Sequence, residues 1–298
     1  MLIKNLMFMF LFAFVLSSQV FSHGKDNHKN YCDSTKTWDW EEFKAEFESF
    51  HKKGKPAVSL DYGLSKTNLK GINSSFAKSN LLELKIGHVM ETPIEESEEI
   101  LKYRFTNVFL SYISTELSNK TSSDGIKSNL WRFGAGWSKG YGYKLGNTSI
   151  TLFNSGSFVW SRLDLKDFPV NPADINKLDR FNKSFRFGTS TEDGIQIKPI
   201  PLISVEAGYE RAVIFERHLF WKWVGSEVIY FAAQGALDAF IHEIKDSSPF
   251  AVPVVNFILK SGLSYGMYQL RQEKMNWPFN TAPPLAYDQF KFGITFVF

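Results

Sequence analysis

The stretch YDQFKFGITFVF, residues 287–298, alternates apolar and polar side chains up to the last residue. Because successive side chains of a strand point to opposite faces, the apolar residues share one face. They are Phe290, Phe292, Ile294, Phe296 and Phe298. The opposite face carries Gln289, Lys291, Gly293, Thr295 and Val297. An exposed apolar strand promotes aggregation in water, so this face requires either a protein core or a lipid bilayer.

This segment resembles the C-terminal signal strand of bacterial outer-membrane β-barrel proteins, which ends in Phe and carries aromatic residues at alternate positions before it. In that family, the barrel-assembly machinery recognises the strand. The resemblance covers about twelve residues. It implies that the chain resides in the outer membrane, with membrane lipid and the assembly machinery as partners. The assembly signal would comprise Phe292, Ile294, Phe296 and Phe298.

The N-terminal region predicts export. Lys4 precedes the uncharged run 6–16, and Val20-Phe21-Ser22 supplies a cleavage site, so residues 1–22 are predicted to be a signal peptide. The apolar run is shorter than the roughly 20 residues of a spanning helix. A retained N-terminal anchor is the alternative. Residues 23–55 are predicted to form a polar leader with a short amphipathic helix at 39–51, preceding a barrel domain at 56–298.

The composition favours a membrane barrel over other classes. Aromatic residues reach 16%, yet the mean hydropathy is −0.19 and no stretch of the mature chain offers 18 consecutive apolar residues. The formal charge of +3 arises from Lys and Arg scattered among nearly as many acids, which argues against nucleic acid as a partner. The single cysteine, Cys32, cannot form an intrachain disulfide.

Strand-like alternation recurs along the chain and predicts an all-β, antiparallel transmembrane barrel of eight strands. The predicted strands are residues 57–65, 80–90, 101–115, 129–143, 148–163, 202–214, 256–270 and 287–298. A phase shift near Asn107 predicts a β-bulge. A further hairpin at 184–189 and 194–199 would make ten strands, although Pro199 and Pro201 disfavour a central strand there.

The predicted topology follows from strand parity, with both chain ends in the periplasm. Parity then places the tight Gly146-Asn147 turn in the periplasm and the long 164–201 connection outside the cell. The link between the sixth and seventh predicted strands would be periplasmic. It contains an amphipathic helix at about 216–246, predicted to lie at the bilayer interface or to plug the barrel. A helix packed against a small soluble subdomain is the alternative.

Alternation also predicts which polar residues face the lumen. The expected lumen residues are Asp61, Glu83, Lys85, Arg132, Glu206, Glu210, Lys260 and Lys291. Since an eight-stranded barrel holds little more than its own side chains, these acids and bases are predicted to pair into a plug. A polar site or a narrow path for a small solute is the alternative.

The sequence indicates an envelope protein rather than an enzyme. His88 is expected on the lipid-facing side and is the one candidate general base for acyl transfer, but no Gly-x-Ser-x-Gly motif accompanies it. No phosphate-binding loop or Cys/His array occurs, so no cofactor or metal is expected. The predicted role is envelope structure, adhesion or limited small-solute transport. A lipid-modifying outer-membrane enzyme and a soluble periplasmic lipid-binding barrel remain alternatives.

Overall fold

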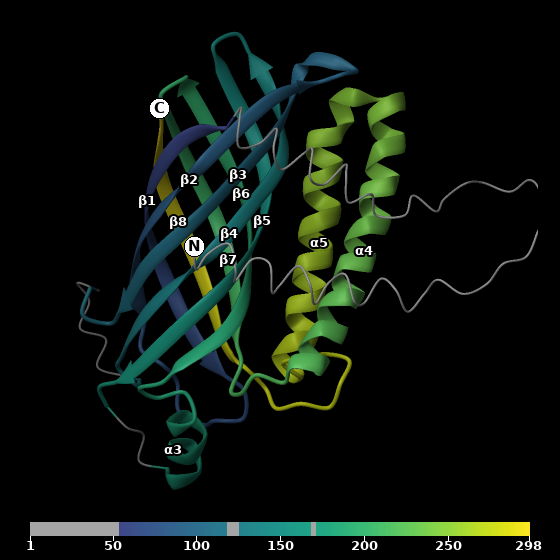
Figure 1. Cartoon of the computed structure of the whole chain (residues 1–298). Coiled ribbons are helices and arrows are strands. Elements are labelled where there is room, and N and C mark those ends of the chain that lie inside the picture. The colour runs from purple at the N-terminus through teal and green to yellow at the C-terminus, as the bar shows by residue number, and fades with distance from the viewer. Residues whose placement is uncertain (1–53, 118–124, 168–170) are drawn as a thin grey trace, which may run out of the picture. The chain divides into compact units, whose positions relative to one another are not determined.

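The computed structural model describes residues 54–117, 125–167 and 171–298. The predicted signal peptide, Cys32 and the predicted helix at 39–51 lie outside these residues. The described residues form a closed antiparallel barrel, and a pair of long helices lies along one side of it (Figure 1).

The barrel has eight strands, each paired with its neighbours in sequence, and it closes between the last strand and the first (Figure 1). The strands are β1 (Lys55–Leu69), β2 (Ser79–Ile94), β3 (Ser97–Ser114), β4 (Ser128–Leu145), β5 (Thr148–Leu165), β6 (Phe185–Ile200), β7 (Ile203–Ile214) and β8 (Leu285–Val297). Closure runs from the pair Ala57 and Val297 to the pair Leu69 and Leu285. The prediction of an eight-stranded antiparallel barrel is confirmed.

One predicted strand is wrong, and one real strand was predicted only as part of the extra hairpin in the ten-stranded alternative. Residues 256–270, predicted as the seventh strand, belong to helix α5 (Val252–Glu273). The 164–201 connection is not a loop, because it contains the long strand β6 and the short helix α3 (Pro172–Asp179). The two short segments of the predicted extra hairpin are therefore parts of one strand.

The predicted bulge near Asn107 is also wrong. Asn107 pairs continuously with Gly87 on β2 and Gly136 on β4. The apparent phase shift has a different cause: the lumen becomes apolar toward this end of β3, so the aromatic residues Tyr103 and Phe105 point inward and are buried. A reversal of polarity between the two faces imitates a shift in register.

Helix α4 (Phe220–Ser247) confirms the predicted helix in type and approximate bounds. Its position in the topology was wrong, because it follows β7 rather than lying between the sixth and seventh barrel strands. A 3-10 turn, η2 (Pro249–Ala251), joins it to α5, so that α4 and α5 form a helical hairpin beside the barrel (Figure 1). Seven strands precede the hairpin, and it therefore begins and ends at the barrel end that carries the long loops 70–78, 115–127 and 166–184.

The tip of the hairpin reaches the opposite end of the barrel, where the short turns lie. The Tyr143 hydroxyl, near the end of β4, donates a hydrogen bond of 2.8 Å to the Phe250 carbonyl oxygen. Lys245 Nζ lies 2.9 Å from Glu96 Oε1 in the β2–β3 turn. The hairpin thus spans the barrel wall from one end to the other. None of the described helices has both the length and the apolar character that a membrane span requires.

The loops at the other end are held together by a buried carboxylate. Asn171 caps α3 by accepting a hydrogen bond from the Ala173 amide. From α3, the Asp174 carboxylate accepts hydrogen bonds from the Ser74 hydroxyl at 2.8 Å and from the Ser74 and Asn73 amides at 3.0 and 3.1 Å. Since Asn73 and Ser74 belong to the β1–β2 loop, this carboxylate joins two loops that are far apart in sequence.

Acid should release this loop contact. Burial alone would raise the pKa of Asp174, but the three donors outweigh it and lower the pKa below its ordinary value of 3.8. A carboxylate with a lowered folded-state pKa stabilises the fold above that ordinary value and loses the contribution as pH falls through the folded pKa. We expect limited proteolysis of loop 70–78 to increase as the pH falls below 3.8, with an acid-stable protease as the probe.

The matched variant is Asp174→Asn, which should open the same loop already at neutral pH and remove most of its acid sensitivity. Asp179→Asn, at the end of the same helix, is the control and should behave like the wild type. Equal proteolysis of the wild type at neutral and acid pH would contradict the assignment.

Candidate functional site

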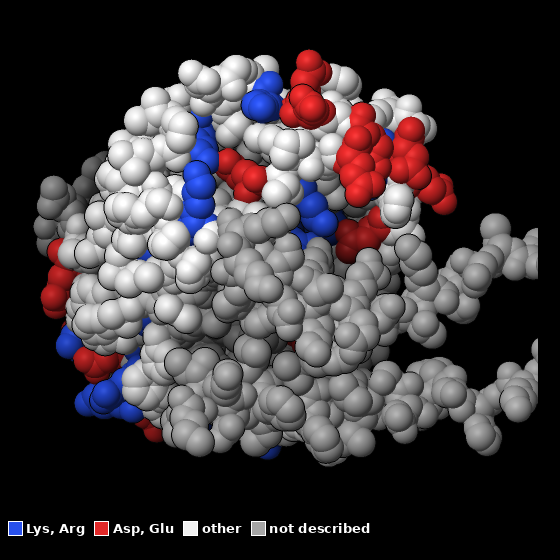
Figure 2. Space-filling view, turned by 45° about the horizontal axis from the view of Figure 1, so that its top comes forward, with Lys and Arg blue, Asp and Glu red and all other residues white. Residues whose placement is uncertain are grey.

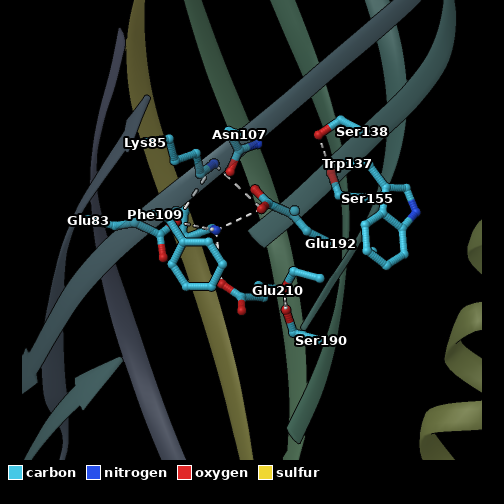
Figure 3. Close-up of a pocket in the computed structure, with 14 residues that line it drawn as sticks. Glu83, Lys85, Asn107, Phe109, Trp137, Ser138, Ser155, Ser190, Glu192 and Glu210 are labelled. Atoms are coloured by element: carbon cyan, nitrogen blue, oxygen red, sulfur yellow. Dashed lines mark hydrogen bonds and ion pairs between the residues drawn. The ribbon is translucent and has the colours of Figure 1, made fainter. Parts of the chain in front are cut away.

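The middle of the lumen is occupied by charged side chains from six strands. Lys85 of β2 lies at the centre, with its Nζ 2.7 Å from Asp61 Oδ2 and 3.4 Å from Glu206 Oε1. Glu83 and Glu192 each place an oxygen 3.7 Å from the same nitrogen. Figure 3 shows Lys85 and Glu192 converging from opposite sides of the lumen. One ammonium group is therefore shared among four carboxyl groups.

A second lysine, Lys291 of β8, extends the cluster. Its Nζ lies 2.7 Å from Glu192 Oε2, 2.9 Å from Glu210 Oε2 and 3.0 Å from Glu83 Oε1. Glu83 and Glu192 thus contact both lysines and link them into one network. Because Lys291, Glu83 and Glu210 are all buried, these contacts lie within the barrel rather than at its mouth.

Arg132 of β4 completes the network and is fully buried, with 0% exposure. Its guanidinium bonds to Glu210 and donates to Gln289 Oε1 at 2.9 Å. A buried arginine needs several acceptors, and the planar guanidinium can donate to two strands at once. Arg132 thereby connects β4 across the lumen to β7 and β8.

Glycine on the inner wall makes room for these acids. A Cβ atom at Gly208 would lie 2.5 Å from Glu192 Oε1, so the Glu192 side chain packs directly over the glycine backbone. The remaining free space among the charges is about 30 Å³, room for a single water molecule or two. This cavity among the described residues is too small for a solute of metabolite size.

Apolar layers close the lumen on both sides of the charges. Toward the long loops, Leu81, Leu130 and Leu163 belong to a buried cluster that also includes Leu178 of α3. Toward the short turns, Val89, Phe105, Phe153 and Val297 form a second cluster. The order along the lumen is apolar, charged, apolar. This arrangement strengthens each ion pair by excluding water from it.

The structure brings together seven of the eight residues predicted for the lumen: Asp61, Glu83, Lys85, Arg132, Glu206, Glu210 and Lys291. Lys260 does not belong to them. It lies on α5, outside the barrel, where its Nζ is 2.5 Å from Asp238 Oδ1 of α4. Its placement in the lumen was wrong because its segment is helical.

Sequence reasoning missed Glu192 and Gln289 as lumen residues. Glu192 lies in β6, whose two faces are both polar at this point, so alternation gave no signal. Gln289 could have been found, since it occupies the polar face of the C-terminal strand together with Lys291.

His88 lies on the outer wall of β2, exposed and on the same face as Leu84 and Ile86. The C-terminal residues Phe292, Ile294, Phe296 and Phe298 are likewise exposed on the outer side. The catalytic role of His88 and the role of the four C-terminal residues as an assembly signal stay predictions.

A second polar region lies outside the barrel, beneath the helical hairpin. Outward-facing positions of β5, β6 and β7 include Asn154, Asp193 and Arg211, and Asp193 pairs with Arg211. Asn154 Nδ2 donates to Asp193 at 2.6 Å and to Ser261 of α5 at 2.9 Å. Ser264 of α5 also donates to Asp193, at 3.2 Å. The polar face of α5 is thereby joined to the polar patch of the wall.

Further contacts fix the two helices to each other and to β8. Arg271 of α5 lies 2.9 Å from Glu227 of α4, with its guanidinium 5.7 Å from the centre of the Tyr230 ring. The Tyr268 hydroxyl donates to Asp288 of β8 at 2.8 Å. These buried polar contacts hold the hairpin against the wall.

Between the hairpin and the wall remains a chamber of about 190 Å³. Its wall side includes Trp137, Lys139 and Phe158, and its helix side includes Phe231 and Lys260. In Figure 3, Trp137 points away from the lumen charges, toward the side on which the helices lie. The lumen cavity and this chamber share the thin stretch of wall around Gly156.

Comparison with known proteins identifies no family. No protein-family model matches the chain, and no curated protein sequence matches it. Among solved structures, Neisserial surface protein A (NspA) covers 82% of this chain and 97% of its own, with a TM-score of 0.39 and 12% identity. Ail, the attachment invasion locus protein of Yersinia pestis, covers 83% of this chain and 99% of its own, with a TM-score of 0.30 and 8% identity.

The lumen network should make the barrel sensitive to loss of a single charge. Arg132→Met removes one of the two cations that Glu210 contacts, leaving only Lys291, and breaking such a buried pair costs up to about 3–5 kcal/mol. We expect the midpoint of urea unfolding, followed by circular dichroism of the purified protein, to fall accordingly. Arg162→Met, an exposed arginine on β5, is the matched control and should be nearly neutral.

The double variant Arg132→Met/Glu210→Gln tests the pairing itself. Neutralising Glu210 should recover part of the lost stability, because the buried carboxylate that has lost one of its two cations is then removed, while Lys291 keeps Glu83 and Glu192. If the two substitutions lower the free energy of unfolding additively, the two side chains are not coupled.

Proposed function

We propose that the chain is an integral outer-membrane β-barrel whose lumen is sealed, serving as an envelope scaffold that displays its long loops at the cell surface. The observation that carries this proposal is the layered lumen: shared ion pairs around Lys85 and Lys291, closed on both sides by apolar clusters. Side chains that satisfy one another in a closed network leave little for a passing solute to bind or displace.

The outer surface supports residence in a membrane. Apolar side chains project from β1, β2, β3 and β8 with large exposed fractions, among them Leu60 at 54%, Ile86 at 53%, Val108 at 60% and Phe292 at 55%. A contiguous apolar surface of this kind marks an interaction with lipid or protein. Figure 2 shows an uncharged flank at the left of the view, with a row of basic side chains beside it and acidic residues gathered at the upper right. A flank of this kind is typical of the lipid-facing side of a membrane barrel.

Loop lengths support an orientation. The connections 95–96, 146–147 and 201–202 are tight turns, whereas all connections at the other end are long. Bacterial outer-membrane barrels have short periplasmic turns and long extracellular loops. We therefore place α3 and both ends of the helical hairpin at the cell-surface side, and the chain terminus Phe298 at the periplasmic side.

A matched pair of arginine substitutions tests the membrane belt. Leu60→Arg and Leu145→Arg alter leucines of similar exposure, 54% and 58%, but Leu60 lies midway along β1 and Leu145 lies at the β4–β5 turn. Arginine at the bilayer midplane costs about 2–4 kcal/mol and near the interface only about 0–1 kcal/mol. We expect Leu60→Arg to lower the free energy of unfolding in lipid vesicles far more than Leu145→Arg. Equal effects would refute the membrane assignment.

A conductance measurement tests the seal. Purified wild-type protein inserted in a planar bilayer should produce no channel steps, and the protein should stay with the membrane fraction after carbonate extraction. Steady single-channel conductance would overturn the sealed lumen and favour solute transport. Release into the soluble fraction would favour a soluble barrel instead.

A further inference from the structure

The outer wall of the barrel carries a polar patch at mid-height, on the side that the helical hairpin covers. Asp193, which pairs with Arg211, lies in the middle of the 16-residue strand β6. The row of cross-strand pairs through Asp193 continues to Tyr209 and Phe290, which are both 42% exposed on the outer face. The patch therefore lies at the same height as the apolar outer face of β8.

The hairpin stands at this height too, because it covers the patch from outside. Ser264 of α5 donates a hydrogen bond to Asp193 at 3.2 Å, and Ser261 of α5 accepts one from Asn154 at 2.9 Å. In Figure 1, α5 lies nearer the barrel and α4 farther from it over most of their length. In a barrel that spans a membrane, the middle of both helices is then at the depth of the hydrocarbon.

The charged side chains in the middle of the hairpin point inward and are paired. Glu227 of α4 and Arg271 of α5 are both buried and contact each other. Lys260 of α5, whose side chain is only 14% exposed, pairs with Asp238 of α4. A hairpin in water shows the opposite arrangement, with its charges outside. Charged residues at membrane depth face the protein interior and pair with one another, as they do here.

The outward face of the hairpin is apolar between two charged ends. On α4, the exposed charges nearest to the middle of the helix are Lys222 and Asp238. Sixteen residues separate them, which is ~24 Å of helix, close to the ~25 Å apolar band of a membrane barrel. Apolar and aromatic side chains exposed on the hairpin within this length are Val228 at 45%, Ile229 at 40%, Ile258 at 61% and Tyr265 at 52%.

The two ends of the hairpin have the composition of a bilayer interface. At its base, Trp221 is 80% exposed beside Lys222. Tryptophan is enriched where a membrane protein meets the headgroups, and a lysine near a helix end extends its charge toward them. At the tip of the hairpin, His242, Glu243 and Asp246 are exposed and require water or headgroups. The apolar length is thus bounded on both sides.

We propose that the helical hairpin stands upright in the hydrocarbon of the bilayer, with the outward face between Lys222 and Asp238 in contact with acyl chains. The barrel wall satisfies its polar face, so the hairpin needs no span of its own. This placement rests on the proposed membrane location of the barrel. It replaces the interfacial or plugging helix expected from the sequence, and it makes the lipid-facing surface part strand and part helix.

Spin labels on single cysteines test the placement in the full chain, reconstituted in vesicles of dioleoyl phosphatidylcholine. Cys32→Ser removes the native thiol. Ala232→Cys labels the middle of the outward face, Leu60→Cys labels the barrel wall, and Ser247→Cys labels the hairpin tip, all three being exposed positions. At Ala232 and Leu60 we expect frequent collisions with oxygen. Collisions with nickel ethylenediaminediacetate should be about tenfold rarer there than at Ser247, because a polar complex loses its hydration in hydrocarbon.

The barrel label separates failure of this placement from failure of the membrane assignment. Frequent nickel collisions at Ala232 with few at Leu60 would place the hairpin in water and overturn the proposal, while the membrane barrel stands. Rare collisions of both reagents at Ala232 would mean that a second copy covers the face, which overturns the contact with lipid. Frequent nickel collisions at both sites would refute the membrane barrel and the hairpin placement together.

A second label guards against a local effect of the first. Ala236 is exposed one helical turn from Ala232 on the same face of α4. Ala236→Cys should give the same collision pattern as Ala232→Cys. Circular dichroism should show wild-type secondary structure for every labelled variant. A nickel-accessible label at Ala236 in such a folded variant would overturn the proposal by itself.

Discussion

The pairing of β8 with β1 is the constraint on which the rest of the structure depends. These strands are furthest apart in sequence, and their ladder from Ala57 and Val297 to Leu69 and Leu285 turns an open sheet into a closed one. Closure removes both sheet edges and gives every strand an inner and an outer face. Lys291 can reach Glu83 and Glu210, on β2 and β7, only because β8 lies between β1 and β7.

Closure also brings charged side chains together inside the lumen, where burying an unpaired charge costs much free energy. Eight strands enclose little more than their own side chains, so Lys85, Lys291 and Arg132 must share the carboxyl groups that surround them. The apolar clusters above and below keep water away from these pairs. This interior is the observation on which the proposed scaffold role rests.

The helical hairpin and the wall beneath it are complementary. Asp193 and Arg211 would be unfavourable on an outer wall in contact with lipid, and Ser264 and Arg271 would be unusual on the buried face of an isolated helix. Packed together, these groups satisfy one another and bury the polar patch. A chamber of about 190 Å³ remains between the hairpin and the wall.

The sequence by itself determined the barrel, seven of its eight strands, the helix at α4 and most of the lumen charges, because strands with one lipid-like and one polar face show a period of two. Only the tertiary structure decided β6 and α5. Thr191 and Asp193 of β6 are polar on the outer face beneath the hairpin, Ser264 of α5 is buried against Asp193, and Arg271 of α5 is buried against Glu227 of α4. Each segment lost its expected pattern through a partner distant in sequence. For this reason Lys260 was wrongly assigned to the lumen and Glu192 was not predicted to lie there. Hydrophobic periodicity indicates which residues contact lipid or an apolar core, but it gives no signal where two polar faces pack together.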